Sequence, residues 1–172
     1  MDRKAALADF EAARSEWATA LSRVPDQALA YLKPGDDYAL GGLQVHVNWV
    51  LVRYNRVLEA VIRGGFGPVP RQDSEAEVED VHRRAGAGLT GLQRKAEVTV
   101  MDDLHSKVTA AVSALPPADW DRKAPVVYGD GQDPYPTSPE DLVGWLRDHY
   151  REHVQQSADL VAEWDAAGRP PR

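Results

Sequence analysis

The sequence contains no cysteine, and this absence restricts the chemistry that the chain can perform with its own side chains. Disulfides, thiolate metal ligands and a cysteine nucleophile are excluded together. A metal site in this protein would therefore have to be built from His, Asp and Glu.

The sequence also lacks an excess of positive charge. It contains 20 Lys and Arg residues and 27 Asp and Glu residues, which gives a net charge of -7. A protein this acidic has no general attraction to phosphate backbones, and no segment is dense enough in Lys and Arg to reverse that. We therefore expect no nucleic-acid partner.

Long apolar runs are absent as well. The longest apolar stretch, Leu43 to Ile62, is interrupted by polar and charged residues throughout its length. A membrane-spanning helix needs about 20 consecutive, mostly apolar residues. The first residues, Met1 to Lys4, lead directly into an amphipathic pattern without an apolar signal core. We expect a soluble, cytoplasmic protein with no membrane partner.

Hydrophobic periodicity predicts a set of long helices. The first one is ended by Pro25, and the second runs from about Tyr38 to Arg63. The segment 74–115 is either one long kinked helix or two helices that meet near residues 86–91, where three glycines weaken the pattern. The last helix covers about 138–164.

Helix-start signals and one long loop complete the predicted organisation. Ser74 with Glu77 is a capping box, and Ser138 followed by Pro139 is a strong start for the last helix. Residues 118–137 form a long loop, with a short extended piece at 126–128. These features predict an all-α fold, a four-helix bundle with a long loop before the last helix, as one domain over residues 1–172.

Two histidines interrupt the apolar face of the last helix. His149 and His153 are four residues apart, so both imidazoles lie on one helical face. That face is otherwise apolar, with Leu142, Leu146 and Leu160. Burying two imidazoles costs free energy unless their nitrogens find partners, and one shared metal ion would serve both. The alternative is that both rings lie at the edge of the face or bond to buried carbonyls.

A third histidine, His46, lies in the apolar run 45–50 of the helix that we expect to be most buried. A lone buried histidine is commonly a satisfied core residue, but this one would face the helix that carries His149 and His153. Three neutral imidazoles with an open fourth position are typical of a catalytic metal site. We predict these three residues as ligands of a divalent metal, zinc or nickel, and we expect His82 and His105, which have charged neighbours, on the surface.

With His46 in the second helix and the His149-x-x-x-His153 pair in the last, the chain resembles the DinB/YfiT-like metalloenzyme superfamily. The segment Leu115 to Trp120 before the long loop, and Gln156 one turn past His153, are also similar. The resemblance implies a mononuclear metal site and a homodimer. It further implies a low-molecular-weight thiol such as mycothiol, used for S-transfer to a small electrophile or for its isomerisation.

Further candidate residues accompany the histidines. Arg53 lies two turns beyond His46 and could bind an anionic substrate, although pairing with an acidic neighbour is the simpler interpretation. Tyr54, Asp148 and Glu152 could orient ligand imidazoles. Arg53 and Tyr54 are the candidates for a catalytic role.

Two other functions are compatible with these sequence features. The first function is a bundle that binds metal or a small ligand without catalysis, for example in stress response. The second is a helical interaction module whose histidines fill the core. The segment 86–91 matches a dinucleotide-binding pattern, but it follows a charged helical segment and not a strand, so we reject it.

Overall fold

The structure, a computed structural model, describes residues 2–168 and is mostly helical. The α-helices are α1 (Arg3–Ser22), α2 (Gly42–Arg63), α3 (Glu75–Ala87), α4 (Gly91–Ser113) and α5 (Pro139–Ala166). Two short 3-10 helices (Asp26–Ala28 and Pro117–Asp119) and two strands, β1 (Ala124–Val126) and β2 (Tyr135–Thr137), complete the described part. The predicted helical fold is confirmed. The proline-rich end after Gly168 lies outside the described residues.

The segment that sequence periodicity left open is two helices, α3 and α4. Each has its own capping box, Ser74 with Glu77 and Thr90 with Gln93. Between them Gly88 has a φ of 72°, a conformation that L side chains rarely adopt. A Cβ there would lie 2.4 Å from the carbonyl oxygen of Leu29. The break therefore needs glycine both for its backbone angle and for the close approach of the preceding loop.

The start of α2 was predicted too early, at about Tyr38. The backbone amides of residues 39–41 donate instead to the carbonyls of Ala85, Tyr31 and Leu29 at 2.8–3.0 Å. These long-range bonds hold the segment outside the helix. Periodicity indicates which residues face the core, but it does not indicate hydrogen bonds to the preceding loop or to α3.

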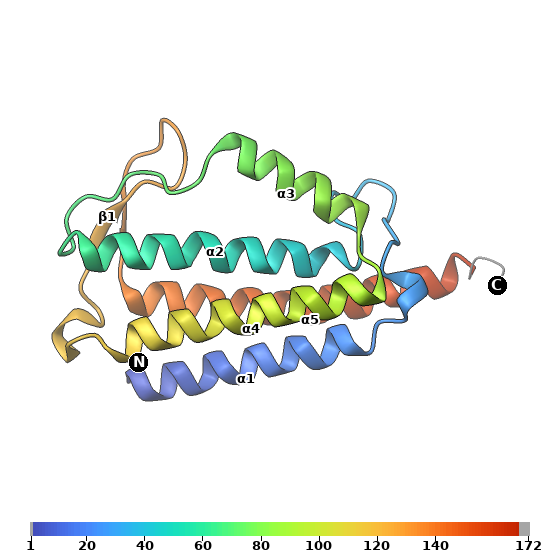
Figure 1. The fold of residues 1–172 in the computed structure, drawn as a ribbon, viewed down its shortest axis with the longest axis horizontal. Coiled ribbons are helices and arrows are strands. Elements are labelled where there is room, and N and C mark those ends of the chain that lie inside the picture. The colour runs from blue at the N-terminus through green and yellow to red at the C-terminus, as the bar shows by residue number, and fades with distance from the viewer. Residues whose placement is uncertain (1, 169–172) are drawn as a thin grey trace.

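Four long helices lie side by side, and α3 covers the outer side of α2 (Figure 1). α1 packs mainly against α5, while α2 contacts α3, α4 and α5. The core between them is filled by large apolar side chains from these helices, among them Phe10, Trp17, Leu21, Leu43, Leu51, Leu58, Met101, Leu142 and Leu146. Among residues 2–168, no helix has both the length and the apolar character needed to cross a membrane.

A small hairpin closes the end of the molecule where α2 ends and α5 begins (Figure 1). β1 and β2 pair antiparallel, and Val69 bridges to Val126 of β1. The extended piece thus begins at Ala124, two residues before the predicted one. The predicted start of α5 is confirmed, because Ser138 and Asp141 form a capping box and Pro139 is the first helical residue.

Candidate metal centre

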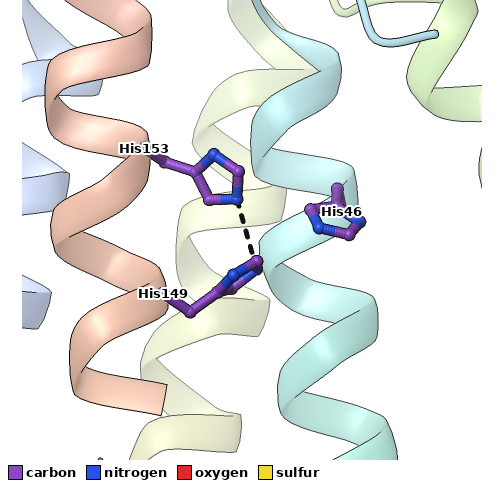
Figure 2. A group of neighbouring side chains, drawn as sticks. All are labelled: His46, His149 and His153. Atoms are coloured by element: carbon purple, nitrogen blue, oxygen red, sulfur yellow. Dashed lines mark hydrogen bonds between the residues drawn. The ribbon is translucent and has the colours of Figure 1, made fainter. Parts of the chain in front are cut away.

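The three predicted histidines come together, with His46 on α2 facing His149 and His153 on α5 (Figure 2). Each imidazole offers one nitrogen, and these three atoms all lie within 4.8 Å of one another. The His46 ring centroid lies 4.9 Å from that of His149 and 5.4 Å from that of His153. We call this group the histidine triad.

The two α5 histidines already have the spacing of two ligands on one ion. Their Nε2 atoms are 3.2 Å apart. Two nitrogens bound to one tetrahedral zinc at about 2.0–2.1 Å would be about 3.3 Å apart. The spacing follows from the helix, because residues four apart stand one above the other on the same face.

All three imidazoles are neutral at neutral pH. Burial, together with the neighbouring imidazoles, lowers the pKa of His46 to about 4 and that of His149 to about 3. Burial also lowers the pKa of His153. Because only the neutral ring has a lone pair free for a metal ion, the triad has the protonation state that metal binding needs.

One ring nitrogen of the triad lacks any partner. Nδ1 of His46 is buried and makes no hydrogen bond with any described residue. Leaving such a group unsatisfied costs about 1–3 kcal/mol. The three neutral imidazoles, whose donor atoms converge, fit a divalent metal ion, and nitrogen donors of this kind suit zinc and nickel.

Gln156 determines which ring nitrogen of His153 carries the proton. Its Oε1 lies 2.7 Å from His153 Nδ1 and can only accept, so Nδ1 carries the hydrogen and Nε2 keeps its lone pair toward His149. The two acidic residues that were predicted to orient the imidazoles do not act this way. Glu152 Oε2 is 4.0 Å from His149 Nδ1, beyond hydrogen-bond distance, and Asp148 pairs with Arg147.

Aromatic rings hold the imidazoles in place. Tyr38 stacks on His46 with centroids 4.7 Å apart and an interplanar angle of 25°. Trp17 lies 6.0 Å from His153, and its indole N–H donates to the buried Gln44 at 2.7 Å. The rings are therefore held by packing from the loop before α2 and from α1.

Arg53 and Tyr54, the candidates for a catalytic role, do not bond to the triad. Arg53 Nε lies 2.9 Å from Asp73 Oδ2, and its Nη2 donates to the carbonyl of Tyr128 at 2.5 Å. The simpler interpretation, pairing with an acidic neighbour, is thus confirmed. The Tyr54 ring contacts Tyr128 and Trp145 instead of an imidazole.

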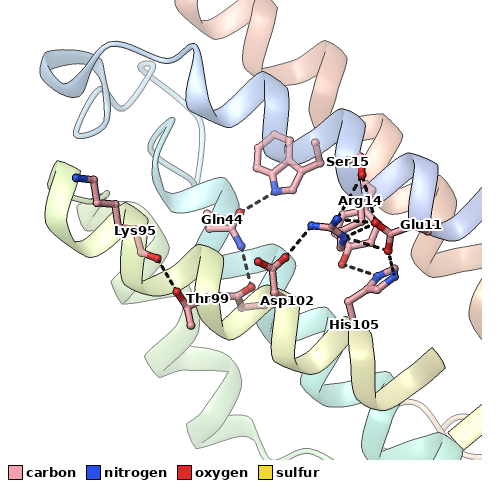
Figure 3. Close-up of polar contacts among 11 residues, drawn as sticks. Glu11, Arg14, Ser15, Gln44, Lys95, Thr99, Asp102 and His105 are labelled. Carbon is pink, nitrogen blue, oxygen red and sulfur yellow. Dashed lines mark hydrogen bonds and ion pairs between the residues drawn. The ribbon is translucent and has the colours of Figure 1, made fainter. Parts of the chain in front are cut away.

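His105 is not on the surface, and that prediction was wrong. The residue is 4% exposed, its Nε2 lies 3.0 Å from Glu11, and its ring stacks on Phe10 with centroids 3.9 Å apart (Figure 3). The acidic residues next to His105 in the sequence suggested an exposed position. The helical spacing of His105 with Met101, Val108 and Val112, the buried residues of α4, would have indicated that it is buried. His82 is exposed, as predicted.

Comparison of the chain with protein-family models, with curated proteins and with solved structures gave no match. The triad and its surroundings are therefore the features of this chain that point to a function.

Proposed function

We propose that this chain is a divalent-metal protein of the DinB/YfiT-like type that uses a low-molecular-weight thiol for S-transfer to a small electrophile or for its isomerisation. The observation that carries the proposal is the convergence of three neutral imidazoles from α2 and α5, with donor atoms within 4.8 Å of one another. His46, His149 and His153 would hold the ion, which we expect to be zinc or nickel.

The residues around the triad have defined tasks in this proposal. Gln156 keeps the Nε2 lone pair of His153 directed toward the centre, and Tyr38 keeps the His46 ring in its plane. A metal ion held there would supply a position at which a thiol binds as its thiolate, the nucleophile that a chain without cysteine must take from outside. Three protein nitrogens leave that position free on a four-coordinate ion.

The arrangement of the elements supports the same family type. The order of four long helices, with one histidine on the second and an H-x-x-x-H pair on the last, matches the pattern of the superfamily. A four-helix bundle of this type, a homodimer and a cytoplasmic location are parts of the same proposal, as is mycothiol as the thiol.

Metal analysis tests the centre. The purified protein should bind one zinc or nickel ion per chain, and His153→Ala should lose it, because two imidazoles hold an ion far less well than three. His82→Ala, which removes an exposed histidine of α3, is the matched control and should keep full occupancy. Full stoichiometric metal in His153→Ala would show that the site is assigned wrongly.

A turnover assay tests the chemistry. The metal-loaded protein is mixed with mycothiol, bacillithiol or glutathione and a panel of small electrophiles. We expect thiol-dependent consumption of an electrophile that His153→Ala abolishes and His82→Ala retains. Metal binding without consumption of any electrophile would refute the catalytic part and favour a bundle that binds metal or a small ligand without catalysis.

A further inference from the structure

A band of aromatic side chains continues from the histidine triad toward the hairpin end of the molecule. We call it the aromatic strip. It consists of the aromatic residues Trp49, Tyr54, Tyr128 and Trp145 together with Arg53, whose guanidinium lies over two of the rings. All five residues are partly buried, in contrast to the fully buried core aromatics Phe10 and Trp17. The side chains of the strip are therefore partly accessible.

On α2, the strip shares a helix face with His46. Trp49 and Arg53 follow His46 at three and seven residues, spacings that return to the same side of a helix. Seven residues correspond to about 10 Å along the helix axis. Arg53 thus lies about two turns from the triad, on the same side of α2.

On α5, the strip lies at the same end of the triad. Trp145 precedes His149 by four residues and so shares its face. α2 and α5 run in opposite directions (Figure 1), so residues after His46 and residues before His149 are neighbours. The ring centroids of Tyr54 and Trp145, 5.8 Å apart, confirm this placement.

Tyr128, from the loop after β1, closes the strip. Its ring is edge-on to those of Tyr54 and Trp145, at 6.3 and 6.1 Å between centroids. Arg53 lies over the rings of both Trp49 and Tyr128, at 5.4 and 5.5 Å. The guanidinium is therefore held at the far end of an aromatic wall.

Arg53 belongs to a network of ion pairs at this end of the strip. Its acidic partner, Asp73, also pairs with Arg71, and Arg71 pairs with Asp130 as well. Nε and Nη2 of Arg53 are engaged by Asp73 and by the carbonyl of Tyr128, whereas Nη1 has no hydrogen-bond partner among residues 2–168. The side chain of Arg53 is 23% exposed, so part of it can be reached from solvent.

We propose that the aromatic strip binds a planar carboxylate, with its anionic group at Arg53, its ring against Trp49 and Trp145, and its reactive end at the histidine triad. Aromatic faces favour a planar body, and the fixed guanidinium favours a carboxylate over a neutral group of the same shape. This inference rests on the proposed function only for the reactive end, and it names the class of electrophile or thiol that the site takes.

The test uses para-(mercaptomethyl)benzoate and the matched amide, para-(mercaptomethyl)benzamide, on the zinc-loaded protein. Binding is followed by calorimetry and by quenching of tryptophan fluorescence, since Trp49 and Trp145 lie in the strip. We expect the acid to bind about tenfold more tightly than the amide, as a hydrogen bond to a charged group provides. Arg53→Gln should abolish this preference.

Two further variants separate the contributions. Arg56→Gln removes the same charge from α2 at a residue that pairs with Glu77 instead of joining the strip, so it should keep the preference. Trp145→Leu should weaken the acid and the amide alike, because it removes stacking and leaves the charge. Melting temperature and zinc content of each variant identify any variant that is not folded.

The outcomes distinguish the two proposals. Equal binding of acid and amide by the wild type, or a preference that survives in Arg53→Gln, overturns the strip proposal even if zinc binds. If zinc does not bind, the proposed function fails, and the strip is then tested with para-toluate against para-toluamide on the metal-free protein. A preference for para-toluate that Arg53→Gln removes would support the strip, and its absence would overturn it.

Discussion

At the scale of single residues, the chemistry of the triad depends on which nitrogen of each imidazole carries a proton. Gln156 decides this for His153, because its amide oxygen accepts from Nδ1 at 2.7 Å. The same contact limits rotation of the ring. Removing an outer contact of this kind typically costs about 10–100-fold in metal affinity.

Replacing Gln156 with leucine should therefore weaken zinc binding without unfolding the protein. The variant loses the acceptor, so His153 can take the wrong tautomer and orientation, and we expect a loss of affinity of about 10–100-fold. Affinity is measured by competition with a chromogenic chelator.

The neighbouring glutamine provides the control. Gln155 is exposed and bonds to Asp159, so Gln155→Leu changes the same functional group one residue away from the contact. It should bind zinc as the wild type does. Equal zinc affinities of the Gln156 and Gln155 variants would show that the tautomer of His153 is not set by this contact.

At the scale of the elements, the break between α3 and α4 positions the loops beside the triad. The Gly88 region approaches the backbone of Leu29 and Ala30, while Ala85 accepts from the amide of Ala39 next to Tyr38. Tyr38 in turn stacks on His46. The turn between two helices on the outer side of α2 is thus connected to one wall of the candidate centre.

Gly88→Ala should destabilise the protein by about 2 kcal/mol or more, since residues in this region of the backbone map cost about 1–3 kcal/mol each even without a clash. The added Cβ would also lie 2.4 Å from the carbonyl oxygen of Leu29. Urea unfolding followed by circular dichroism measures the change.

Gly144→Ala is the matched control for this substitution. Gly144 lies inside α5, and a Cβ there would meet nothing within 4 Å. Alanine should stabilise the helix by about 0.5–1 kcal/mol. If both alanine variants shifted stability in the same direction, the break would not depend on the left-handed conformation of Gly88.

At the scale of the whole molecule, α1 and α4 are joined largely by polar contacts. Three arginines span this side. Arg3 donates to the carbonyls at the end of α4, Arg14 pairs with Asp102, and Arg94 donates to the carbonyls at the end of α1. The buried His105 lies between the two helices near Arg14 (Figure 3).

The pH dependence of stability should reflect His105. Burial lowers its pKa from 6.5 to about 4, with Glu11 and Asp102 opposing that shift, Arg14 adding to it, and the Tyr150 hydroxyl 3.5 Å from Nδ1. Below pH 6.5 the imidazole of residue 105 is therefore protonated in the unfolded chain, whereas in the folded chain it is protonated only below about pH 4. The free energy of unfolding consequently falls as the pH falls through this window.

His105→Gln removes this titration and should lose less stability than the wild type between pH 7.5 and 4.5. Urea unfolding of the metal-free proteins at several pH values in that range gives the difference in free energy of unfolding. The difference between the free energies of unfolding of the wild type and of His105→Gln should become steadily smaller as the pH falls. A difference that stays constant across the range would contradict the assignment to His105.

The local signals of the sequence were sufficient for most of the helices and for the identity of the three histidines. Capping boxes at Ser74 and Ser138 mark helix starts because they depend on contacts three residues apart. The apolar stripe around His149 and His153 shows that both rings face inward because side-chain direction repeats with the helix. His46 was found in the same way, as a polar residue in an apolar run.

Only the tertiary structure decided which buried groups meet. It brought His46 within reach of the α5 pair, placed His105 against Glu11, and turned Arg53 toward Asp73 and Tyr128. It also delayed the start of α2, through hydrogen bonds within the connection before this helix and from Ala39 to Ala85 of α3. The periodicity of a helix fixes the direction in which a side chain points, but its partner is set by the packing of other helices, and no local pattern in the sequence encodes that packing.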